Sequence, residues 1–329
     1  MKTPRLGFLG VGWIGADRLR ALARSGTAEI AAVADPSEPA RTRLLEAFPS
    51  ARAGSGLDAL LETERLDGVV IATPSALHAE QSIAVLDRGI PVFCQKPLGR
   101  TAAEVRAVVD TGRRADRLLG VDMSYRHTAA MRAIRDLVRN GWLGHVYAAE
   151  LVFHNAYGPD GGWFYDRRLS GGGCVMDLGI HLVDLALWIL GGDVEDVAAD
   201  LFAGGRPLRV RDDDAVDDYA EIRLRLAGDR VVRIACSWNL NAGRDAVMEA
   251  RFHGTERGAS MVNIDGSFYD FRAELHDGTA TDRIVDPPDD WGGRAAVRWA
   301  RRLAGDASFD PEVEELVTVA EILDRIYGR

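Results

Sequence analysis

The sequence predicts an α/β fold in which a doubly wound parallel sheet is followed by an α+β domain with an open, mostly antiparallel sheet. Over the first third of the chain, short apolar runs alternate with helical patterns, as in βαβ units. A glycine-rich turn joins the first apolar run to the first helix. Farther along, β-like runs with partial alternation are joined by Gly and Asp turns, which favours an antiparallel sheet.

Length and composition limit the possible classes of protein. The 329 residues suggest two domains, which we place at residues 1–122 and 123–329. With 47% hydrophobic and 27% charged residues the composition is that of a globular protein, and the net charge of −10 disfavours nucleic acid as a partner. Since no apolar run reaches about 18 residues, we expect no membrane span. Residues 6–15 are glycine-rich and precede charged residues, so we do not read them as a signal segment.

The cysteines indicate the compartment. Cys94, Cys174 and Cys236 are odd in number and far apart in the sequence. This pattern fits neither a disulfide framework nor a cysteine zinc site, and we expect a protein of the reducing cytoplasm without a metal.

The first third contains the elements of a parallel sheet in order. The helix at residues 16–25 carries Leu19, Leu22 and Ala23 at helical spacing and is closed by Gly26. Further helices are predicted at residues 79–88 and 102–114, and strands at residues 6–10, 29–34, 66–73, 90–94 and 118–122.

The turn Gly10-Val11-Gly12-Trp13-Ile14-Gly15 has the G-x-G-x-x-G spacing of a dinucleotide-binding Rossmann fold. Gly10 permits the tight turn, Gly12 lets the backbone approach a pyrophosphate, and Gly15 lets helix and strand pack closely. The N-terminus of the following helix offers unpaired N–H groups to the phosphates. Because the turn lies between a predicted strand and helix, we expect it to bind a dinucleotide.

Asp35 ends the second predicted strand, 20 residues beyond Gly15. A carboxylate at this place accepts hydrogen bonds from the adenosine ribose and repels a 2′-phosphate. The sequence therefore predicts NAD in preference to NADP. Arg41 lies several residues into the next helix, and we do not expect it to clamp a phosphate.

Two further segments, residues 72–78 and 94–98, follow predicted strands at the edge where open α/β sheets bind ligands. In the second, Lys96 is notable because only it and Lys2 are lysines among 40 basic residues. Arginine stays protonated, whereas a buried lysine can release its proton. Lys96 is therefore a candidate for proton transfer, the alternative being a solvated surface charge. The alternative for Thr73-Pro74 is a simple helix start.

The remainder of the chain is predicted to be rich in strands. Strands are expected at residues 145–153, 194–202, 219–226, 230–238, 247–252 and 260–264, and helices at 131–139, 174–190 and 311–327. The aspartates Asp212, Asp213, Asp214, Asp217 and Asp218 lack the spacing of a calcium loop, and we interpret them as a solvated acidic loop.

Three glycines, residues 171–173, introduce the most informative helix. Asp177 and His181 are four residues apart and Asp184 three further on, so an α-helix would place them along one stripe. A carboxylate one turn from an imidazole can orient it for proton transfer near neutral pH. The alternative is a capping acid and a buried structural histidine. His78, His145 and His154 form no cluster with His181 in the sequence, which disfavours a metal site.

Taken together, these motifs resemble the Gfo/Idh/MocA family, named for glucose–fructose oxidoreductase and inositol dehydrogenase. The resemblance covers nearly the whole chain. It includes Gly10–Gly15, Asp35, residues 72–78, Lys96-Pro97, Arg126, Trp163 and Gly171–Asp184, and extends to the acidic final helix. It implies a Rossmann domain, an α+β domain whose final helix returns towards the first domain, and nicotinamide-dependent oxidation of a hydroxyl, or reduction of a ketone, on a sugar or cyclitol.

The resemblance also implies roles for individual residues. Lys96 would hydrogen-bond the reacting hydroxyl and help remove its proton, His181 would exchange that proton, and Asp177 would position the substrate and support the histidine. Substrate-side contacts are expected from Arg126 and Trp163. The residues expected to bind the cofactor are Gly10, Gly12, Trp13, Ile14, Gly15, Asp35, Thr73, Pro74, His78, Gln95 and Lys96.

One position departs from the family pattern. The family usually shows Glu-Lys-Pro, and this chain has Gln95-Lys96-Pro97. A carboxylate that would favour the charged form of Lys96 is thereby absent, and the change bears equally on contacts between domains.

The sequence leaves two alternative functions besides net oxidation or reduction of a substrate. They are an NAD-dependent glycosidase or lyase that uses transient oxidation, and a non-catalytic dinucleotide sensor. Because an open sheet needs cover on its second face, we expect a homodimer or homotetramer.

Overall fold

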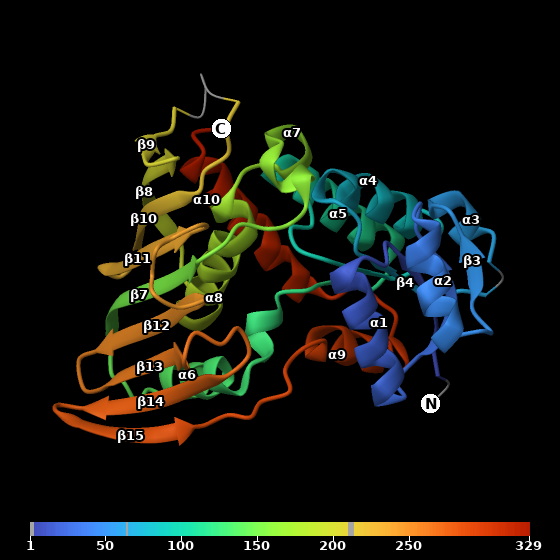
Figure 1. Ribbon diagram of the computed structural model, residues 1–329. Coiled ribbons are helices and arrows are strands. Elements are labelled where there is room, and N and C mark those ends of the chain that lie inside the picture. The colour runs from blue at the N-terminus through green and yellow to red at the C-terminus, as the bar shows by residue number, and fades with distance from the viewer. Residues whose placement is uncertain (1–2, 64, 210–213) are drawn as a thin grey trace. The chain divides into compact units, whose positions relative to one another are not determined.

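The computed structural model describes residues 3–63, 65–209 and 214–329. The chain divides into two compact units. Figure 1 shows the chain coloured by residue number, from blue at the N-terminus to red at the C-terminus. The first unit consists of residues 1–124 and 292–317, and the second of residues 125–291 and 318–329. Residues 292–317 thus lie in the first unit, whereas the sequence analysis placed them in the second domain.

A six-stranded parallel sheet forms the centre of the first unit, in the order β3-β2-β1-β4-β5-β6. Its strands are β1 (Arg5–Leu9), β2 (Glu29–Ala34), β3 (Arg52–Gly54), β4 (Gly68–Ile71), β5 (Val92–Cys94) and β6 (Leu119–Val121). The strand order reverses between β1 and β4. This is the switch point at which open α/β sheets bind their ligands.

Helices connect these strands and cover the sheet. They are α1 (Trp13–Ser25), α2 (Glu38–Ala47), α3 (Leu57–Leu61), α4 (Ser75–Leu86) and α5 (Ala102–Ala115). The predicted doubly wound parallel sheet is therefore confirmed. The short elements α2, β3 and α3 were not expected from the sequence, since their few buried residues leave no clear apolar period.

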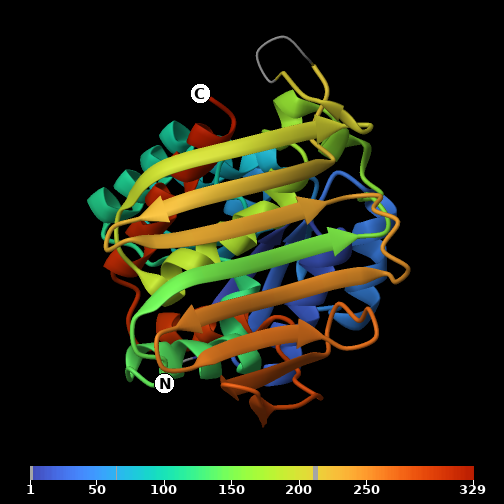
Figure 2. The same cartoon turned by 90° about the vertical axis from the view of Figure 1, so that its left-hand side faces the viewer.

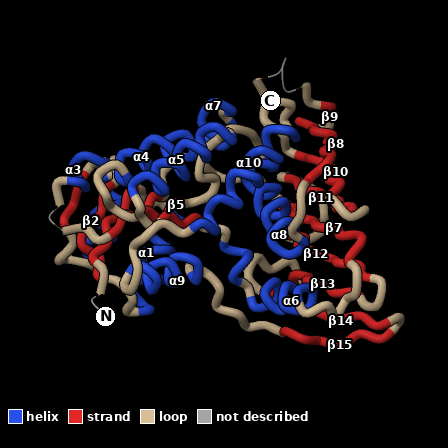
Figure 3. The backbone as a smooth tube through the Cα atoms, turned by 180° about the vertical axis from the view of Figure 1, so that it is seen from behind, coloured by secondary structure: helices blue, strands red, loops and turns tan. Residues whose placement is uncertain are grey.

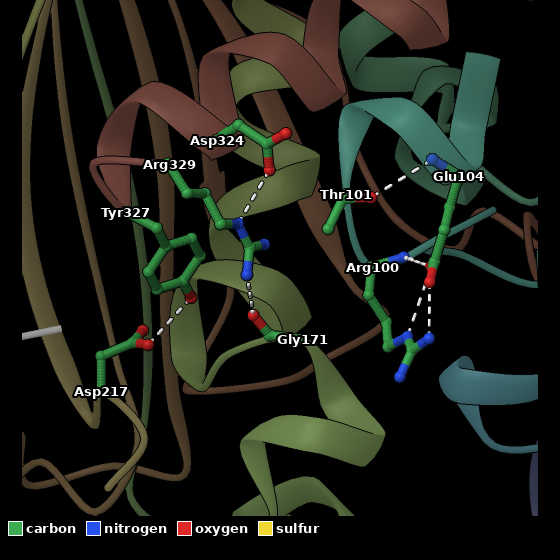
Figure 4. A network of polar contacts seen from close by, with 8 residues as sticks. All are labelled: Arg100, Thr101, Glu104, Gly171, Asp217, Asp324, Tyr327 and Arg329. Carbon is green, nitrogen blue, oxygen red and sulfur yellow. Dashed lines mark hydrogen bonds and ion pairs between the residues drawn. The ribbon is translucent and has the colours of Figure 1, made fainter. Parts of the chain in front are cut away.

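Local hydrogen bonds define where α5 begins. The Thr101 side chain accepts a hydrogen bond from the Glu104 amide at 3.2 Å, and the Glu104 carboxylate accepts one from the Arg100 amide at 2.7 Å (Figure 4). Arg100 and Glu104 also form an ion pair. These reciprocal bonds satisfy N–H groups that a helix start otherwise leaves unpaired.

Helix α9 (Arg294–Leu303) completes the core of the first unit. Its buried face combines small alanines with Trp299. A Cβ atom at Gly68 in β4 would lie 2.7 Å from the Trp299 ring, and one at Gly120 in β6 would lie 2.6 Å from it. The two strand glycines therefore make room for the indole, which packs 5.6 Å from the ring of Phe93.

The second unit contains a nine-stranded sheet in the order β15-β14-β13-β12-β7-β11-β10-β8-β9. Neighbouring strands are antiparallel except β7 and β11, which run parallel. The strands are β7 (Val146–Asn155), β8 (Val194–Ala203), β9 (Arg206–Pro207), β10 (Tyr219–Leu226), β11 (Arg230–Ser237), β12 (Ala246–Gly254), β13 (Gly258–Asn263), β14 (Phe271–Asp277) and β15 (Ala280–Val285). This confirms the predicted open, mostly antiparallel sheet.

Helices α6 (Ala129–Arg139) and α8 (Ile180–Leu190) pack along one face of this sheet (Figure 3). Figure 2 looks onto the opposite face, where the strands are drawn without a covering helix in the described part of the chain. The division between the units falls within α10 (Glu315–Ile326). Strands β14 and β15 were not predicted, and β15 is exposed at nearly every position, which removes the apolar alternation that marks a strand.

One helical stretch, Arg167–Leu190, is long and apolar enough to cross a membrane by length and composition alone. Its 18-residue apolar window has a mean hydropathy of 1.7, and 78% of that window is buried inside the protein. A buried core helix meets the same criteria, so this feature is weak evidence for a membrane span.

Candidate active site

The glycine-rich turn between β1 and α1 has the shape that the sequence predicts. Gly10 adopts a φ of +82°, and a Cβ there would lie 2.6 Å from the backbone carbonyl of Ala72. A Cβ at Gly15 would lie 2.1 Å from the Gly10 oxygen. At Gly12, by contrast, a Cβ would meet no atom of the described residues within 4 Å. Two glycines thus fix the turn, and the third leaves its backbone open to a phosphate group, as a dinucleotide requires.

Asp35 organises the loops around this turn. Its carboxylate, in a residue only 9% exposed, accepts hydrogen bonds from the amides of Val11 and Ser37, each at 2.8 Å. The Arg41 guanidinium donates to the Asp35 backbone carbonyl. Each carboxylate oxygen has a further lone pair, so Asp35 retains the capacity to accept ribose hydroxyls. Sequence reasoning did not foresee that Arg41 would lie against Asp35.

His78 ties two loops of the first unit together. Its Nε2 lies 2.6 Å from the Thr73 carbonyl oxygen, and its Nδ1 lies 2.7 Å from that of Pro97. Burial lowers the pKa of His78, an effect opposed by the two carbonyl groups and reinforced by the charge of Lys96. Since His78 is 1% exposed, it fixes the loops that bear Thr73, Pro74 and Lys96.

Gln95 and Lys96 follow β5 at the same edge of the sheet. The backbone N–H of Gln95 donates to the Ile71 carbonyl at 2.8 Å, and the side-chain Nε2 of Gln95 donates to the Asp122 carboxylate at 2.6 Å. Asp122 also pairs with Arg18, and the sequence analysis identified neither residue as part of the site. Lys96 is half-buried and is joined to Pro97 by a cis peptide bond.

In the second unit, a π-helical turn precedes α8. The sequence predicts one regular helix over residues 174–190, but residues Val175–Gly179 are π-helical and α8 begins at Ile180. A π turn has more residues per turn than an α-helix, so the regular α-helical spacing expected from Asp177 to His181 and Asp184 is wrong over residues 175–179. Such turns occur frequently at functional sites.

Asp177 lies beside a group of aromatic side chains. The Trp238 indole Nε1 donates to its carboxylate at 3.1 Å. The rings of Phe164 and Tyr165 pack edge-on to Trp238. The ring of Trp163 stacks on that of Phe164, with the ring centroids 3.8 Å apart. The expected substrate contact Trp163 therefore belongs to an aromatic surface near Asp177. Burial raises the pKa of Tyr165, as do the charges of Asp160 and Asp177.

His181 is 5% exposed and lies against the ring of Tyr125. The ring of Tyr125 meets its imidazole edge-on, with centroids 4.8 Å apart and planes at 79°. Tyr125 in turn contacts Phe153, Phe271 and Trp291. Tyr125 was missed because its partners are distant in the sequence.

Asp184 forms an ion pair with Arg126. The Arg126 guanidinium donates to both carboxylate oxygens, at 2.8 and 2.6 Å, and Asp184 is 1% exposed. The Arg126 side chain is 16% exposed and also lies 5.7 Å from the Trp188 ring. This fork-on-fork pair commits much of the guanidinium that we expect on the substrate side.

Packing explains two of the three glycines before the π turn, while Gly171 has a φ of +86° where the preceding helical turn ends. A Cβ at Gly172 would lie 2.1 Å from the Tyr327 hydroxyl, and one at Gly173 would lie 1.9 Å from the Asp217 carbonyl oxygen. The Asp217 carboxylate accepts the amides of Gly173 and Val175, each at 2.8 Å. Figure 4 shows the Tyr327 hydroxyl on the same carboxylate, and Arg329 donating to the Gly171 carbonyl at 3.0 Å.

Asp217 corrects the interpretation of the acidic run as a solvated loop. Asp217 is fully buried and caps the start of the helix, while Asp214 is exposed as expected. Asp212 and Asp213 lie outside the described residues. Asp217 was not distinguished from its neighbours in the sequence because it lies in a run of aspartates, although its side chain is buried.

Two of the cysteines are neighbours in space. The Sγ atoms of Cys174 and Cys236 lie 3.8 Å apart, and all three cysteines are free and buried. Burial raises the pKa of Cys94 to about 12. Thiols this deeply buried are poor nucleophiles. Within residues 3–63, 65–209 and 214–329, no group of three His, Cys, Asp or Glu side chains gathers to hold a metal ion.

The residues expected at the site therefore fall into two groups. The first unit brings together the glycine turn, Asp35, the Thr73–His78 loop, Gln95 and Lys96. The second unit holds Arg126, Trp163, Asp177 and His181. A dinucleotide cradle on a parallel sheet, joined to an open antiparallel sheet with a carboxylate and a histidine on one helical segment, defines a Rossmann-fold oxidoreductase.

Family models agree with both halves. Residues 5–123 match the oxidoreductase family with an NAD-binding Rossmann fold, and residues 131–260 match the GFO/IDH/MocA C-terminal domain. The chain belongs to the Gfo/Idh/MocA family.

Individual relatives have varied names. The chain is 35% identical over 197 residues to the rhizopine catabolism protein MocA of Rhizobium meliloti, covering 58% of each sequence. It is 30% identical over 190 residues to D-glucoside 3-dehydrogenase of Escherichia coli (strain K12), covering 57% of this chain and 54% of that one. These alignments span little more than half of the two relatives. D-apiose dehydrogenase of Paraburkholderia graminis is 29% identical over 300 residues, covering 89% and 74%.

Solved structures share the fold. A 3-ketoreductase from Actinomadura kijaniata, in complex with TDP-benzene and NADP, superimposes with a TM-score of 0.86 at 21% identity, covering 99% of this chain and 98% of that one. Levoglucosan dehydrogenase in complex with NADH and L-sorbose gives a TM-score of 0.84 at 21% identity, covering 100% and 97%. Their cofactors differ, so fold alone does not choose between NAD and NADP.

Proposed function

We propose that this protein is a dehydrogenase that transfers hydride between NAD and a secondary hydroxyl group, or the corresponding ketone, of a sugar, cyclitol or related compound. The observation that carries the proposal is the turn from Gly10 to Gly15, in which two glycines are required by close contacts and Gly12 leaves the backbone open. The relatives named as dehydrogenases of glucosides, apiose and inositol support the substrate class.

The residues of the first unit fit the cofactor. The open backbone at Gly12 and the first amides of α1 suit the pyrophosphate, because helix α1 starts there without a side-chain cap. Asp35 suits the adenosine ribose. Thr73, Pro74 and Gln95 lie in loops at the carboxyl edge of the sheet, where the nicotinamide end would lie. In this proposal the cofactor-binding domain is residues 1–122 with α9 added, and the substrate domain is most of residues 123–329.

Proton handling is assigned to three side chains. When bound, the nicotinamide supplies the redox chemistry, and the protein supplies orientation and proton transfer. Lys96 Nζ hydrogen-bonds the reacting hydroxyl and helps to remove its proton. His181 exchanges that proton with the substrate oxygen, and its ring is held by Tyr125. Asp177, anchored by the Trp238 indole, positions the substrate hydroxyls beside the aromatic surface of Trp163.

Preference for NAD over NADP rests on Asp35. Its carboxylate is fixed by two amide donors at the end of β2 and would repel a 2′-phosphate. The Arg41 guanidinium, bonded to the Asp35 carbonyl, is the nearby positive charge that opposes this preference. We expect NADH to bind at least about tenfold more tightly than NADPH, a difference of roughly 1.4 kcal/mol.

The preference is tested by titrating NADH and NADPH fluorescence. Asp35→Ser should weaken NADH binding and narrow the ratio of the two dissociation constants. Glu38→Ser, which removes an exposed acid only three residues away, should leave the ratio unchanged. Tighter binding of NADPH by the unaltered protein would overturn the preference.

Two further features support the proposed assembly and compartment. The helix-free face of the nine-stranded sheet in Figure 2 supports a homodimer or homotetramer. The buried free cysteines support a reducing, cytoplasmic setting.

The proposed reaction is tested with a panel of sugars, glycosides and cyclitols incubated with NAD, with NADH formation followed by absorbance. Analysis of the products separates net oxidation from hydrolysis or elimination through transient oxidation. Failure of the protein to bind NADH or NADPH would overturn the proposal, and binding without turnover of any polyol would favour a sensor.

A further inference from the structure

A buried polar cluster lies next to Lys96 in the first unit. Gln95 Nε2 donates to Asp122 Oδ2 at 2.6 Å, and Arg18 Nε donates to the same oxygen at 2.5 Å. Gln95 is 6% exposed and Asp122 is fully buried, while the Arg18 side chain is 7% exposed. Arg18 also pairs with Asp17. The other oxygen, Asp122 Oδ1, is buried without a hydrogen-bond partner among the described residues.

The charges in this cluster are matched. A carboxylate withdrawn from water is tolerated only when a cation and hydrogen-bond donors compensate for the lost hydration. Burial by itself lowers the pKa of Arg18, but Asp122 and Asp17 outweigh it and raise that pKa. Asp122 therefore has one guanidinium and one neutral amide as donors, and both donors converge on a single oxygen.

This geometry explains why position 95 carries an amide. The Asp122 oxygen can only accept, so the Gln95 side chain must present its NH₂ group there. A glutamate at position 95 would place two carboxylate oxygens about as close as the present 2.6 Å hydrogen bond. Two carboxylates that share such a site cannot both ionise, and one of them must hold a proton. The presence of Gln95 in place of the family's usual glutamate thus matches the presence of a carboxylate at Asp122, which follows β6.

The cluster also connects two parts of the proposed cofactor site. Arg18 lies in α1, one turn beyond the glycine-rich loop, and Gln95 directly precedes Lys96. Asp122 follows β6, and its amide bonds the Cys94 carbonyl at 2.9 Å. The two side-chain bonds of Asp122 therefore run from the phosphate-binding helix to the segment that carries the lysine.

We propose that Asp122 is a positioning residue that requires glutamine at position 95 and, through Gln95 and Arg18, holds Lys96 in place relative to the phosphate-binding helix α1. The part concerning Lys96 rests on the proposed dehydrogenase function. The part concerning the pairing of residues 95 and 122 does not, and it is tested without substrate or cofactor.

The first experiment measures thermal unfolding of the cofactor-free protein at pH 5.5 and pH 8. Gln95→Glu should lower Tm by roughly 5–10 °C at pH 8, because breaking a buried pair is costly in a protein of this size. The loss should shrink at pH 5.5. A shared site raises the carboxyl pKa of the folded variant, so the folded state binds the extra proton and its stability falls as pH rises.

Matched variants make this result specific. Asn140→Asp, an amide-to-acid change at an exposed position, should show neither effect. The double variant Gln95→Glu/Asp122→Asn returns the cluster to one carboxylate and should recover at least half of the Tm lost in Gln95→Glu. If Gln95→Glu behaves like Asn140→Asp at both pH values, or if the double variant is no more stable than Gln95→Glu, the pairing is wrong.

The second experiment addresses Lys96 and uses Asp122→Asn, which keeps an acceptor for both donors but removes the charge. We expect kcat to fall about tenfold or more, with KM and the Kd for NADH each changing less than about threefold. Parental kcat in Asp122→Asn would overturn the positioning role. If the protein binds no NADH at all while the unfolding pattern holds, the dehydrogenase function fails and the pairing of Gln95 with Asp122 stands.

Discussion

The Tyr327 hydroxyl donates to the Asp217 carboxylate at 2.8 Å, although the two residues are 110 positions apart in the sequence. The same carboxylate caps the amides of Gly173 and Val175, so the C-terminal segment helps to fix the start of the helical region that bears Asp177 and His181. Both Tyr327 and Asp217 are buried, and burial raises the pKa of Tyr327 well above its usual range, as does the charge of Asp217.

This relationship predicts a graded loss of stability. Tyr327→Phe removes one hydrogen bond and should lower the free energy of unfolding by about 1 kcal/mol, while Asp217→Asn disturbs several charged bonds and should cost about 2–3 kcal/mol. Urea denaturation at pH 7.5 measures both. Asp214→Asn, an exposed acid in the same loop, should stay within about 0.5 kcal/mol of the parent. Equal effects of Asp214→Asn and Asp217→Asn would contradict the capping role.

Replacement of Lys96 by arginine should abolish turnover although the charge is kept. Arginine cannot accept a proton, and its planar fork does not occupy the position of an amine. We expect kcat to fall by about 10²–10⁴-fold, with NAD binding retained within about tenfold. Lys2→Arg, which changes the only other lysine, is the control and should leave kcat unchanged. Near-parental kcat in Lys96→Arg would show that the rarity of lysine reflects codon usage.

Asp177 and His181 should act as one unit. Each alanine variant should lower kcat by about 10²–10⁴-fold, and the double variant should lose much less than the product of the single losses. The rise of kcat with pH should shift or vanish in His181→Ala. Trp238→Phe, which removes the indole N–H that holds Asp177, should reduce kcat in the parent but have little further effect in Asp177→Ala. Multiplicative losses with an unchanged pH profile would mean that the two residues pack independently.

His78 should make stability depend on pH. Its pKa is lowered from the ordinary value of 6.5, chiefly by burial. The unfolded chain therefore binds a proton that the folded protein does not, and stability is lost as pH falls below about 6.5. In denaturant titrations of the cofactor-free protein between pH 7.5 and 5.5, His78→Gln should show a shallower fall than the parent. The exposed His145→Gln should keep the parental slope, and an unaltered slope in His78→Gln would refute the assignment.

Local signals predicted the elements whose chemistry is local. The turn from Gly10 to Gly15 needs glycine because of contacts with its own neighbours and with the adjacent strand, so its pattern is visible in the sequence. The strands of the first sheet other than β3 were recognisable for a different reason, because burial on both faces makes them continuously apolar.

Residues whose role depends on distant partners were missed or misread. Asp217 is hidden in an acidic run because its donors lie near residue 173 and at the C-terminus. Asp122 has no motif, and its meaning comes from Gln95 and Arg18, which belong to other elements. The stripe expected for Asp177 and His181 assumed a regular α-helix, and a π turn cannot be inferred from spacing alone.

The packing of Trp299 against Gly68 and Gly120 affects how the first unit folds during translation. Helix α9 emerges from the ribosome more than 170 residues after β6, the last strand of the sheet that it covers. At about 5–20 residues per second, the nascent N-terminal unit waits roughly ten to thirty seconds with that face uncovered. During this interval the unit presents an apolar groove shaped for an indole. Folding of the N-terminal unit is thus completed only after residues 294–303 have been translated, and chaperones that shield apolar surface have this groove as a defined target.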